Sequence, residues 1–345
     1  MPRRSPREHD RSITEVFIAI LVVGGAGYIG SHTARTLRRA GYEVILYDNL
    51  STGSRRLAQG FELIEGDIAD NGTLRPVLAR VDAVMHFAAH AYVGESVVDP
   101  RKYFGNNVAS ALTLLNSALD AGIRRIVFSS SCAVYGVPRQ IPITEETPRE
   151  PVNPYGASKL FFENALEAYG RAYGLRSMSL RYFNAAGADT SGEIGELHRP
   201  ETHLIPLALA ATASGRDLQI FGSDYGTADG TCIRDYIHVD DLAEAHLRAL
   251  QYLESAAENA ADSLALNLGS GRGHSVLQII EAAETAAGRP IRRSMQPRRA
   301  GDPPVLIADP AKAQRVLGWT AKRNLDDIIS SAWAWMQRSS RRRAA

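Results

Sequence analysis

A glycine-rich turn between an apolar run and a helical stretch is the feature that most restricts the fold of this chain. The run Phe17–Val23 leads into the turn Gly24–Gly30, and helical spacing then continues to Ala40, where Gly41 ends the helix. Glycines allow close approach of a pyrophosphate, and the helix N-terminus offers free N–H groups and the positive end of its dipole. The next apolar run ends at Asp48, whose carboxylate can accept hydrogen bonds from ribose hydroxyls and would repel a 2′-phosphate. The sequence therefore predicts a site for NAD rather than NADP.

Short apolar runs alternate with helical stretches through the first half of the chain. These runs have a near-continuous hydrophobic character; they are Phe17–Val23, Val44–Tyr47, Phe61–Ile64, Ala83–Phe87 and Ile126–Ser129. Such runs, separated by helices, predict a parallel sheet that is covered on both faces. We expect an α/β fold with a Rossmann-type doubly wound parallel sheet and a smaller α/β substrate-binding lobe.

After about Phe183 the alternation of apolar runs and helical stretches becomes less regular, which predicts a division of the chain into two lobes. We expect a disordered extension in residues 1–15 and an NAD-binding Rossmann domain in 16–183. Residues 184–338 are expected to form mainly the substrate-binding lobe, with some segments returning to the first lobe, and 339–345 a basic tail.

Composition argues against several kinds of partner. The 39 Lys and Arg residues balance the 38 Asp and Glu residues, so charge gives no case for nucleic acid or a membrane surface. The apolar run Val16–Val23 is too short to span a bilayer. Cys132 and Cys232 form neither a disulfide framework nor a zinc motif, and His86 and His90 lie around a strand end rather than on one helix face. We expect a cytoplasmic protein without a metal.

The segment Asn153–Lys159 carries a tyrosine and a lysine four residues apart. Pro154 suits the first turn of a helix that runs to Tyr173, and this spacing puts Tyr155 and Lys159 on one face. A phenol with a pKa of about 10 is too weak a base at neutral pH, but a nearby ammonium and a positive nicotinamide ring favour the phenolate. Without further context, such a pair is more often an ordinary surface pair on a helix.

A run of three serines ends the fifth predicted strand. Ser129, Ser130 and Ser131 should lie at the carboxyl edge of the sheet, where ligands of doubly wound folds bind. A hydroxyl there is suited to passing a proton between a substrate oxygen and the phenolate. Serine, tyrosine and lysine in this order, after a glycine loop, are much more specific than any of them alone.

Long motifs in the same order throughout the chain point to one family. They include GGAGYIGSHT, DNLSTG, EGDI, HFAAHAYVGESV, SSSCAVYG, NPYGASK, LRYFNAAGA and IFGSDYGTADGTCIRDYIHV. Over about residues 17 to 338, the chain resembles the UDP-galactose 4-epimerases of the extended short-chain dehydrogenase/reductase superfamily. The resemblance implies a homodimer, formed through the helices around 101–121 and 154–173.

The resemblance implies roles for individual residues. Tyr155 is the base, Lys159 tunes it and binds the nicotinamide ribose, and Ser131 assists proton transfer. The implied NAD contacts are Gly24, Gly27, Tyr28, Ile29, Gly30, Asp48, Asn49, Asp67, Ile68, Phe87, Ala88, Ala89, Asn106, Ser131, Tyr155, Lys159, Tyr182 and Phe183. For Asp67, capping of the following helix is an equally good interpretation.

The implied substrate contacts come mostly from the second half of the chain. They are Ser131, Tyr155, Asn184, His203, Leu204, Gln219, Ile220, Phe221, Arg234, Arg299, Asp302 and Leu306. The two arginines suit a diphosphate, because a guanidinium can hold two oxygens at once. Arg234 beside Asp235 could instead form an ordinary ion pair. His203 departs from the family pattern, in which Asn can stand before the leucine.

The activity implied is interconversion of UDP-glucose and UDP-galactose. NAD would oxidise carbon 4 to a 4-keto sugar, which turns and is reduced on its opposite face. Alternatives are UDP-xylose and UDP-arabinose or UDP-N-acetylhexosamines as substrates, although the size of Leu306 favours plain hexoses over N-acetylated ones. A 4,6-dehydratase is disfavoured because no acidic pair follows Ser131. A non-catalytic nucleotide-binding scaffold is a remote alternative.

Overall fold

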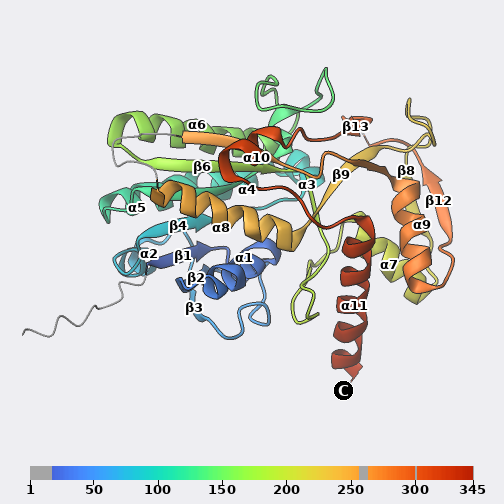
Figure 1. Cartoon of the computed structure of the whole chain (residues 1–345), viewed down its shortest axis with the longest axis horizontal. Helices are drawn as coiled ribbons and strands as arrows, with labels where there is room; N and C mark the ends of the chain where they lie inside the picture. Colours follow the sequence, from blue (N-terminus) through green and yellow to red (C-terminus); the bar gives the residue numbers. More distant parts are fainter. Residues whose placement is uncertain (1–17, 256–262, 300, 345) are drawn as a thin grey trace, which may run out of the picture.

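A seven-stranded parallel sheet forms the centre of the larger lobe (Figure 1). The computed structural model describes residues 18–255, 263–299 and 301–344, so Phe17 and the expected N-terminal extension lie outside the described residues. The strand order is β10-β6-β5-β4-β1-β2-β3. This order reverses between β1 and β4, as in Rossmann-type folds, and the predicted fold class is confirmed.

Five of the seven strands of this sheet overlap the predicted apolar runs, whereas β6 and β10 were not among those runs. The strands are β1 Ala19–Val23, β2 Glu43–Asp48, β3 Glu62–Glu65, β4 Ala83–His86, β5 Arg125–Ser131, β6 Arg176–Tyr182 and β10 Ser263–Leu268. Side chains in β1 show why such runs are apolar throughout. Ile20 and Val22 belong to the core on one face, and Leu21 and Val23 belong to the core on the other. A strand buried on both faces has no polar side.

Helices cover both faces of the sheet. One face packs against α1 Tyr28–Arg39, α8 Val239–Ser255 and α10 Ala311–Leu317. The other face packs against α2 Asn71–Leu78, α5 Ala111–Asp120 and α6 Pro154–Tyr173. Two short helices, α3 Val93–Val98 and α4 Pro100–Phe104, and a π-helical segment, Gly105–Ser110, precede α5.

Helix α6 has the predicted bounds, and its end signals explain why. The side-chain oxygen of Asn153 accepts a hydrogen bond from the backbone N–H of Gly156 at 2.8 Å, and Pro154 occupies the first turn. At the other end Gly174 adopts a left-handed conformation with φ of 68°, which glycine allows at little cost. The helix start therefore fixes the position of Tyr155.

The smaller lobe contains two small sheets and three helices (Figure 1). One sheet joins β7 Asn184–Ala186, β9 Ile233–His238, β11 Gly273–Ser275 and β13 Val305–Leu306, and the other pairs β8 Leu218–Phe221 with β12 Arg293–Gln296. The helices α7 Leu204–Ser214, α9 Val276–Ala287 and α11 Leu325–Ala344 share one apolar core with β8 and β9. The expected basic tail continues α11 up to Ala344.

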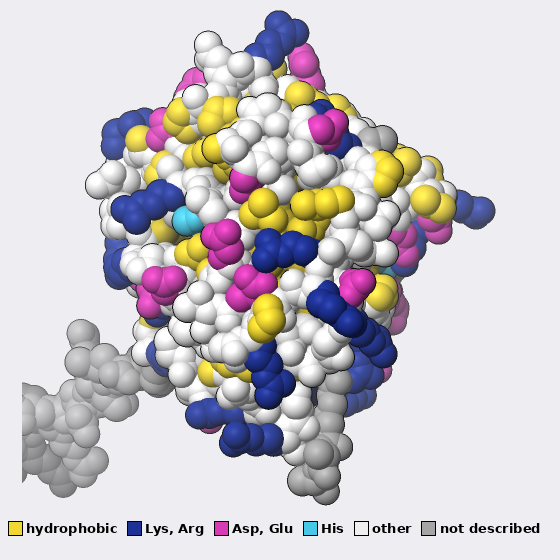
Figure 2. All heavy atoms as spheres, turned by 90° about the vertical axis from the view of Figure 1, so that its right-hand side faces the viewer, with side chains coloured by type: hydrophobic (Ala, Val, Ile, Leu, Met, Phe, Trp, Pro, Cys, Tyr) yellow, Lys and Arg dark blue, Asp and Glu magenta, His cyan; other side chains and the backbone are white. Residues whose placement is uncertain are grey.

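The face of the smaller lobe carries charges of both signs. Figure 2 shows basic and acidic side chains interspersed there with apolar and uncharged ones. This mixture agrees with the near-zero net charge of the sequence. Among the described helices, none combines the length and the apolar character needed to cross a bilayer.

Candidate active site

The glycine turn lies against the end of β4 so closely that only glycine fits. A Cβ atom on Gly24 would lie 2.6 Å from the backbone nitrogen of Ala88, and one on Gly30 would lie 2.3 Å from the carbonyl oxygen of Gly24. Gly27 is the N-cap of α1 and supplies no side-chain cap to the first N–H groups of that helix. A narrow backbone cradle with free helix N–H groups fits the pyrophosphate of a dinucleotide.

Asp48 closes the cradle from the end of β2. Its carboxylate accepts hydrogen bonds from the backbone N–H groups of Ala26 at 3.0 Å and Leu50 at 2.8 Å. Burial raises the pKa of Asp48, and the two backbone hydrogen bonds act in the opposite direction. The acidic residue thus lies beside the glycine turn, as the sequence predicts for a ribose-binding carboxylate.

The structure brings Asn49 and Asp67 together at the edge of the same site. The amide of Asn49 donates to Asp67 Oδ2 at 2.8 Å, and Ile68 is buried beside them. The alternative interpretation of Asp67 as a helix cap is wrong, because α2 is capped by Asp70, which accepts from the N–H of Gly72 at 2.9 Å. The predicted adenine contact remains a prediction.

The other predicted cofactor residues lie beside the ends of β1, β4 and β6. The backbone N–H of Ala88 donates to the Val23 carbonyl oxygen at 3.1 Å, and the Phe87 ring lies 4.7 Å from the His246 ring. Ala89 follows on in the same partly buried segment. Asn106 donates to the side chain of Asn107 at 2.9 Å.

The first helical turn of α1 also reaches the smaller lobe. The Tyr28 hydroxyl donates to the carbonyl oxygen of Gly187 at 2.6 Å. Ile29 packs against the core on the face of the large sheet that α1, α8 and α10 cover. The loop after β7 is therefore tied to the helix that begins at the glycine turn.

Ser131, Tyr155 and Lys159 come together at the carboxyl end of β5. Ser131 is the last residue of that strand and Tyr155 lies in the first turn of α6. Burial raises the pKa of the Tyr155 phenol to about 12, and a hydrogen bond from the Ser131 hydroxyl lowers it. The nitrogen of Lys159 lies 5.8 Å from the centre of the Tyr155 ring. The predicted triad is thus assembled in one place.

Contacts with strand β5 hold the Lys159 side chain in place. Its ammonium donates to the carbonyl oxygen of Ser129 at 2.8 Å and lies 4.9 Å from the centre of the Phe128 ring. Burial lowers the pKa of Lys159 to about 7, and the Glu163 carboxylate acts in the opposite direction. Lys159 is only 3% exposed, so its charge acts in a weakly screened environment.

Tyr182 is the last residue of β6, and Phe183 follows it. The Tyr182 hydroxyl is hydrogen-bonded to the Ser129 hydroxyl. Phe183 belongs to a small core with Tyr135, Ile143 and Ala308, against which Leu306 packs. Both predicted residues therefore border the triad, although Tyr182 and Phe183 are themselves largely buried.

Arg234 forms an ion pair with a residue other than Asp235, its neighbour in the chain. Its guanidinium contacts the carboxylate of Asp302, another predicted substrate residue. Asp235 instead accepts hydrogen bonds from Ser270 at 2.6 Å and from the N–H of Gly271 at 3.0 Å. The Arg234–Asp235 interpretation is therefore wrong. Leu306 pairs with Arg234 in the register of β13 and β9.

The remaining predicted substrate residues are distributed over β7, β8 and the start of α7. Asn184 lies opposite Tyr236 in the small sheet. Gln219 is exposed, Ile220 is buried, and the guanidinium of Arg299 lies 4.2 Å from the centre of the Phe221 ring. His203 is the N-cap of α7 and Leu204 its first residue, but the His203 ring faces Glu196 at 2.6 Å.

Sequence reasoning missed a buried network beneath the triad. Glu163 lies one turn after Lys159 on α6 and pairs with Arg181 of β6 at 2.6 Å. Tyr135 accepts from Arg181 at 2.8 Å and donates to Asn267 at 2.7 Å. The four-residue spacing from Lys159 was a usable signal for Glu163. No local signal marks the Arg181 partner.

Comparison with known proteins gives a consistent result. Residues 20–269 match the model of the NAD dependent epimerase/dehydratase family. The UDP-glucose 4-epimerase of Rhizobium meliloti is 52% identical over 322 residues, covering 92% of this chain and 97% of that protein.

Two crystal structures resemble the chain over nearly its whole length. UDP-glucose 4-epimerase from Brucella ovis in complex with NAD is 50% identical with a TM-score of 0.88, covering 92% of this chain and 97% of that one. The enzyme from Stenotrophomonas maltophila, with bound NAD and formylated UDP-arabinopyranose, is 39% identical with a TM-score of 0.89, covering 95% and 100%.

Proposed function

Because the chain belongs to the NAD dependent epimerase/dehydratase family, we propose that it is an isomerase that interconverts UDP-glucose and UDP-galactose at carbon 4. The observation that carries the proposal is the position of Tyr155, since the Lys159 nitrogen lies 5.8 Å from its ring centre and Ser131 is close enough to lower the pKa of its phenol. They lie at the end of β5, two strands from the glycine turn at the end of β1. Adjacent strands are about 4.8 Å apart, so roughly 10 Å separates the two parts of the site.

The residues of the cradle fit NAD, and bound NAD supplies a hydride acceptor that becomes a hydride donor in the second half of the reaction. The turn Gly24–Gly30 holds the pyrophosphate, Asp48 the adenosine ribose, and Lys159 the nicotinamide ribose. Because no net oxidation occurs, the enzyme needs no added NAD once it is loaded.

Tyr155 takes the proton of the sugar 4-hydroxyl and later returns it. Lowering the phenol pKa from about 12 to near 7 takes about 7 kcal/mol of favourable interaction with the phenolate. The value of about 12 already contains the effects of burial and of the Ser131 side chain, so the positive charge of bound NAD beside the phenol is the main remaining source.

Arg234 and Arg299 hold the diphosphate while the sugar itself is held loosely enough to turn. Affinity then resides in the nucleotide end, which does not change in the reaction. Leu306 packs beside Phe183 and Cys132 and leaves less room for an N-acetyl group than a small side chain would. This arrangement supports plain hexoses as substrates.

The enzyme works as a homodimer in the cytoplasm. In support of the dimer, six large apolar side chains on α3, α4 and α6 are exposed; they are Val93, Val97, Val98, Phe104, Phe161 and Tyr173. In support of a reducing compartment, Cys132 and Cys232 are both free thiols.

The test is product analysis with UDP-glucose, UDP-N-acetylglucosamine and UDP-xylose in parallel, without added NAD. We expect UDP-glucose to give UDP-galactose, and UDP-N-acetylglucosamine to give little or no product. NAD should be released from the purified protein on denaturation.

The other outcomes identify the alternatives. Fast turnover of UDP-N-acetylglucosamine, or preference for UDP-xylose, would replace the proposed substrate within the same reaction class. No turnover of any of the three, combined with no NAD released, would favour a nucleotide-binding scaffold instead.

A further inference from the structure

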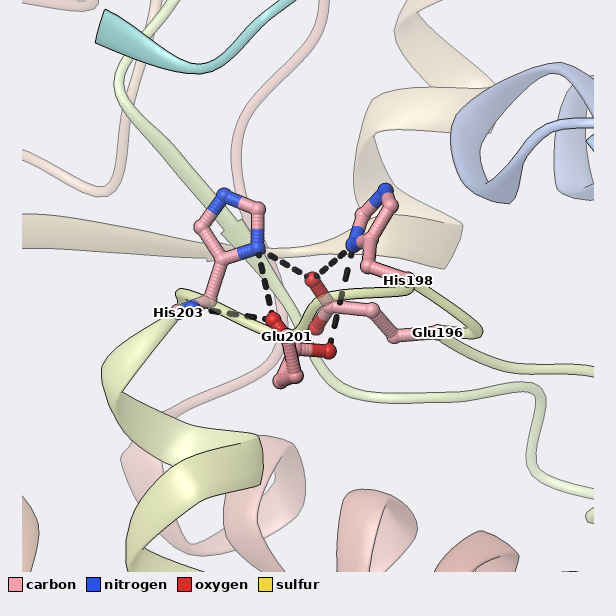
Figure 3. A group of neighbouring side chains, drawn as sticks. All are labelled: Glu196, His198, Glu201 and His203. Atoms are coloured by element: carbon pink, nitrogen blue, oxygen red, sulfur yellow. Dashed lines mark hydrogen bonds and ion pairs between the residues drawn. The ribbon is translucent and has the colours of Figure 1, made fainter. Parts of the chain in front are cut away.

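Four side chains of the loop between β7 and α7 converge on one point (Figure 3). They are Glu196, His198, Glu201 and His203. Glu196 Oε1 lies 2.9 Å from His198 Nδ1 and 2.6 Å from His203 Nδ1. Glu201 Oε1 lies 3.2 Å from His203 Nδ1, and Glu201 Oε2 lies 3.9 Å from His198 Nδ1. One ligand atom from each of the four residues lies within 4.8 Å of those of the other three.

These separations suit the ligand shell of a small cation. Zinc binds histidine nitrogen and carboxylate oxygen at roughly 2.0–2.2 Å in a tetrahedron, which places the ligand atoms roughly 3.4 Å apart. The observed separations of 2.6, 2.9, 3.2 and 3.9 Å lie on both sides of that value. Because the four ligand atoms all lie within 4.8 Å of one another, each separation differs from the tetrahedral value by no more than about 1.4 Å.

The loop is held in place by contacts outside the four side chains. The indole N–H of Trp335 donates to the Glu196 carbonyl oxygen at 3.0 Å, and the Tyr92 hydroxyl donates to that of Pro200 at 3.0 Å. Glu201 Oε1 accepts from the backbone N–H groups of Thr202 at 2.8 Å and His203 at 2.9 Å. Such contacts orient ligands before a metal arrives.

Burial of the cluster is uneven in a way that permits metal entry. The Glu196 side chain is 6% exposed, whereas His203 is 45% exposed. A buried carboxylate beside a more exposed imidazole gives a cation both charge and access.

We propose that this loop binds a divalent transition-metal ion, best matched by Zn²⁺, through Nδ1 of His198 and His203 and one oxygen each of Glu196 and Glu201. Two imidazoles and two carboxylates favour such an ion over Ca²⁺ or Mg²⁺, which prefer oxygen ligands alone. Four protein ligands fill a tetrahedron, so the site is of the structural type. From the sequence we expected no metal, because Cys132 and Cys232 form no zinc motif and His86 and His90 lie around a strand end.

The position of the loop indicates what the metal stabilises. The His198 ring lies 6.3 Å from the Tyr28 ring of α1 and 6.2 Å from the Tyr92 ring. Tyr28 begins the helix after the glycine turn, and Tyr92 precedes α3. A metal ion would therefore fix the smaller lobe's loop against two segments of the larger lobe. In Figure 3, His203 Nε2 points away from the cluster, which leaves it for the predicted substrate contact.

The experiment uses the full-length, untagged protein after treatment with a chelator. Titration with ZnCl₂ by calorimetry should give one site per chain, and Co²⁺ should give the visible absorption of a tetrahedral nitrogen and oxygen site. His198→Gln and Glu201→Gln should each weaken Zn²⁺ binding more than about tenfold. Zn²⁺ should raise the melting temperature of the wild type and not that of His198→Gln.

His274→Gln is the matched control, because it removes a partly buried histidine of β11 outside the cluster. It should bind Zn²⁺ like the wild type. Circular dichroism checks that each variant is folded. No saturable Zn²⁺ binding by the wild type would overturn the proposal. Unchanged affinity and unchanged Co²⁺ absorption in both folded cluster variants would also overturn it.

Discussion

Glu163 and Arg181 form an ion pair of 2.6 Å in which the two side chains are only 2% and 3% exposed. The pair lies beneath the catalytic triad, since Glu163 follows Lys159 by one helical turn and also accepts a hydrogen bond from Ser130. Removal of Glu163 takes away the carboxylate partner of the buried Arg181, and removal of Arg181 leaves Glu163 with only the longer contact of 3.6 Å to Arg149. Either loss costs far more than the loss of an exposed ion pair.

The first prediction concerns this pair. Arg181→Met and Glu163→Met should each lower the free energy of unfolding by about 3–5 kcal/mol. The double variant should lose clearly less than the sum, because no charge is then left unpaired. Urea unfolding of all four proteins measures this. Additive losses would show that the two charges do not depend on each other.

The second prediction concerns the proposed base. Tyr155→Phe should lower kcat by about 100- to 10,000-fold, because the general acid–base contribution is lost while the pocket keeps its shape. The NAD content should stay as in the wild type. Tyr169→Phe is the control on the same helix, where the hydroxyl donates to Asn116 near the surface. Unchanged turnover in Tyr155→Phe would remove Tyr155 from the mechanism.

The third prediction concerns the cradle. Gly30→Ala should abolish NAD retention, because its Cβ would lie 2.3 Å from the Gly24 carbonyl oxygen and the turn would have to open. Gly94→Ala is the control, since a Cβ there meets nothing within 4 Å. It should keep NAD and gain up to about 1 kcal/mol of stability in α3. NAD released on denaturation gives the measurement, and full NAD content in Gly30→Ala would contradict the assignment.

The fourth prediction concerns acid stability. Burial lowers the pKa of His86 to about 3, so the folded protein binds fewer protons there than the unfolded chain, whose histidine titrates near 6.5. Stability is therefore fully present above pH 6.5 and declines as the pH falls toward 3. At pH 5 the loss due to His86 is about 2 kcal/mol.

His86→Phe provides the comparison, because His86 already lies among aromatic rings, 5.6 Å from that of Phe128 and 5.3 Å from that of Phe162. Between pH 7.5 and pH 5, the wild type should lose more unfolding free energy than the variant by this amount. The buried His238 and His246 titrate in the same direction in both proteins and cancel. Parallel pH curves would contradict the prediction.

The sequence predicted five of the seven strands of the larger sheet, because strands buried on both faces are apolar throughout. Strand β2 extends the predicted Val44–Tyr47 by one residue at each end, and β4 ends one residue before the predicted Phe87. Helix α6 was predicted to the residue, because proline and glycine mark its ends. Where a local rule decides the structure, the sequence is sufficient.

Interactions between distant segments were not predictable in the same way. Asp67 and Asp70 are equally good caps by local chemistry, and only the path of the chain after β3 gives α2 to Asp70. Arg234 finds Asp302, 68 residues away, rather than its neighbour.

Strand β10 has a consequence for how the protein is made. It pairs with β6 in register Ser177↔Ser263, so a long segment that includes β7, β8 and β9 of the smaller lobe emerges from the ribosome between the two partners. Until then the edge of β6 presents unpaired backbone groups, which invite pairing with another chain. The nascent chain is therefore most vulnerable to misassembly after its dinucleotide cradle has been synthesised and before its seventh strand arrives.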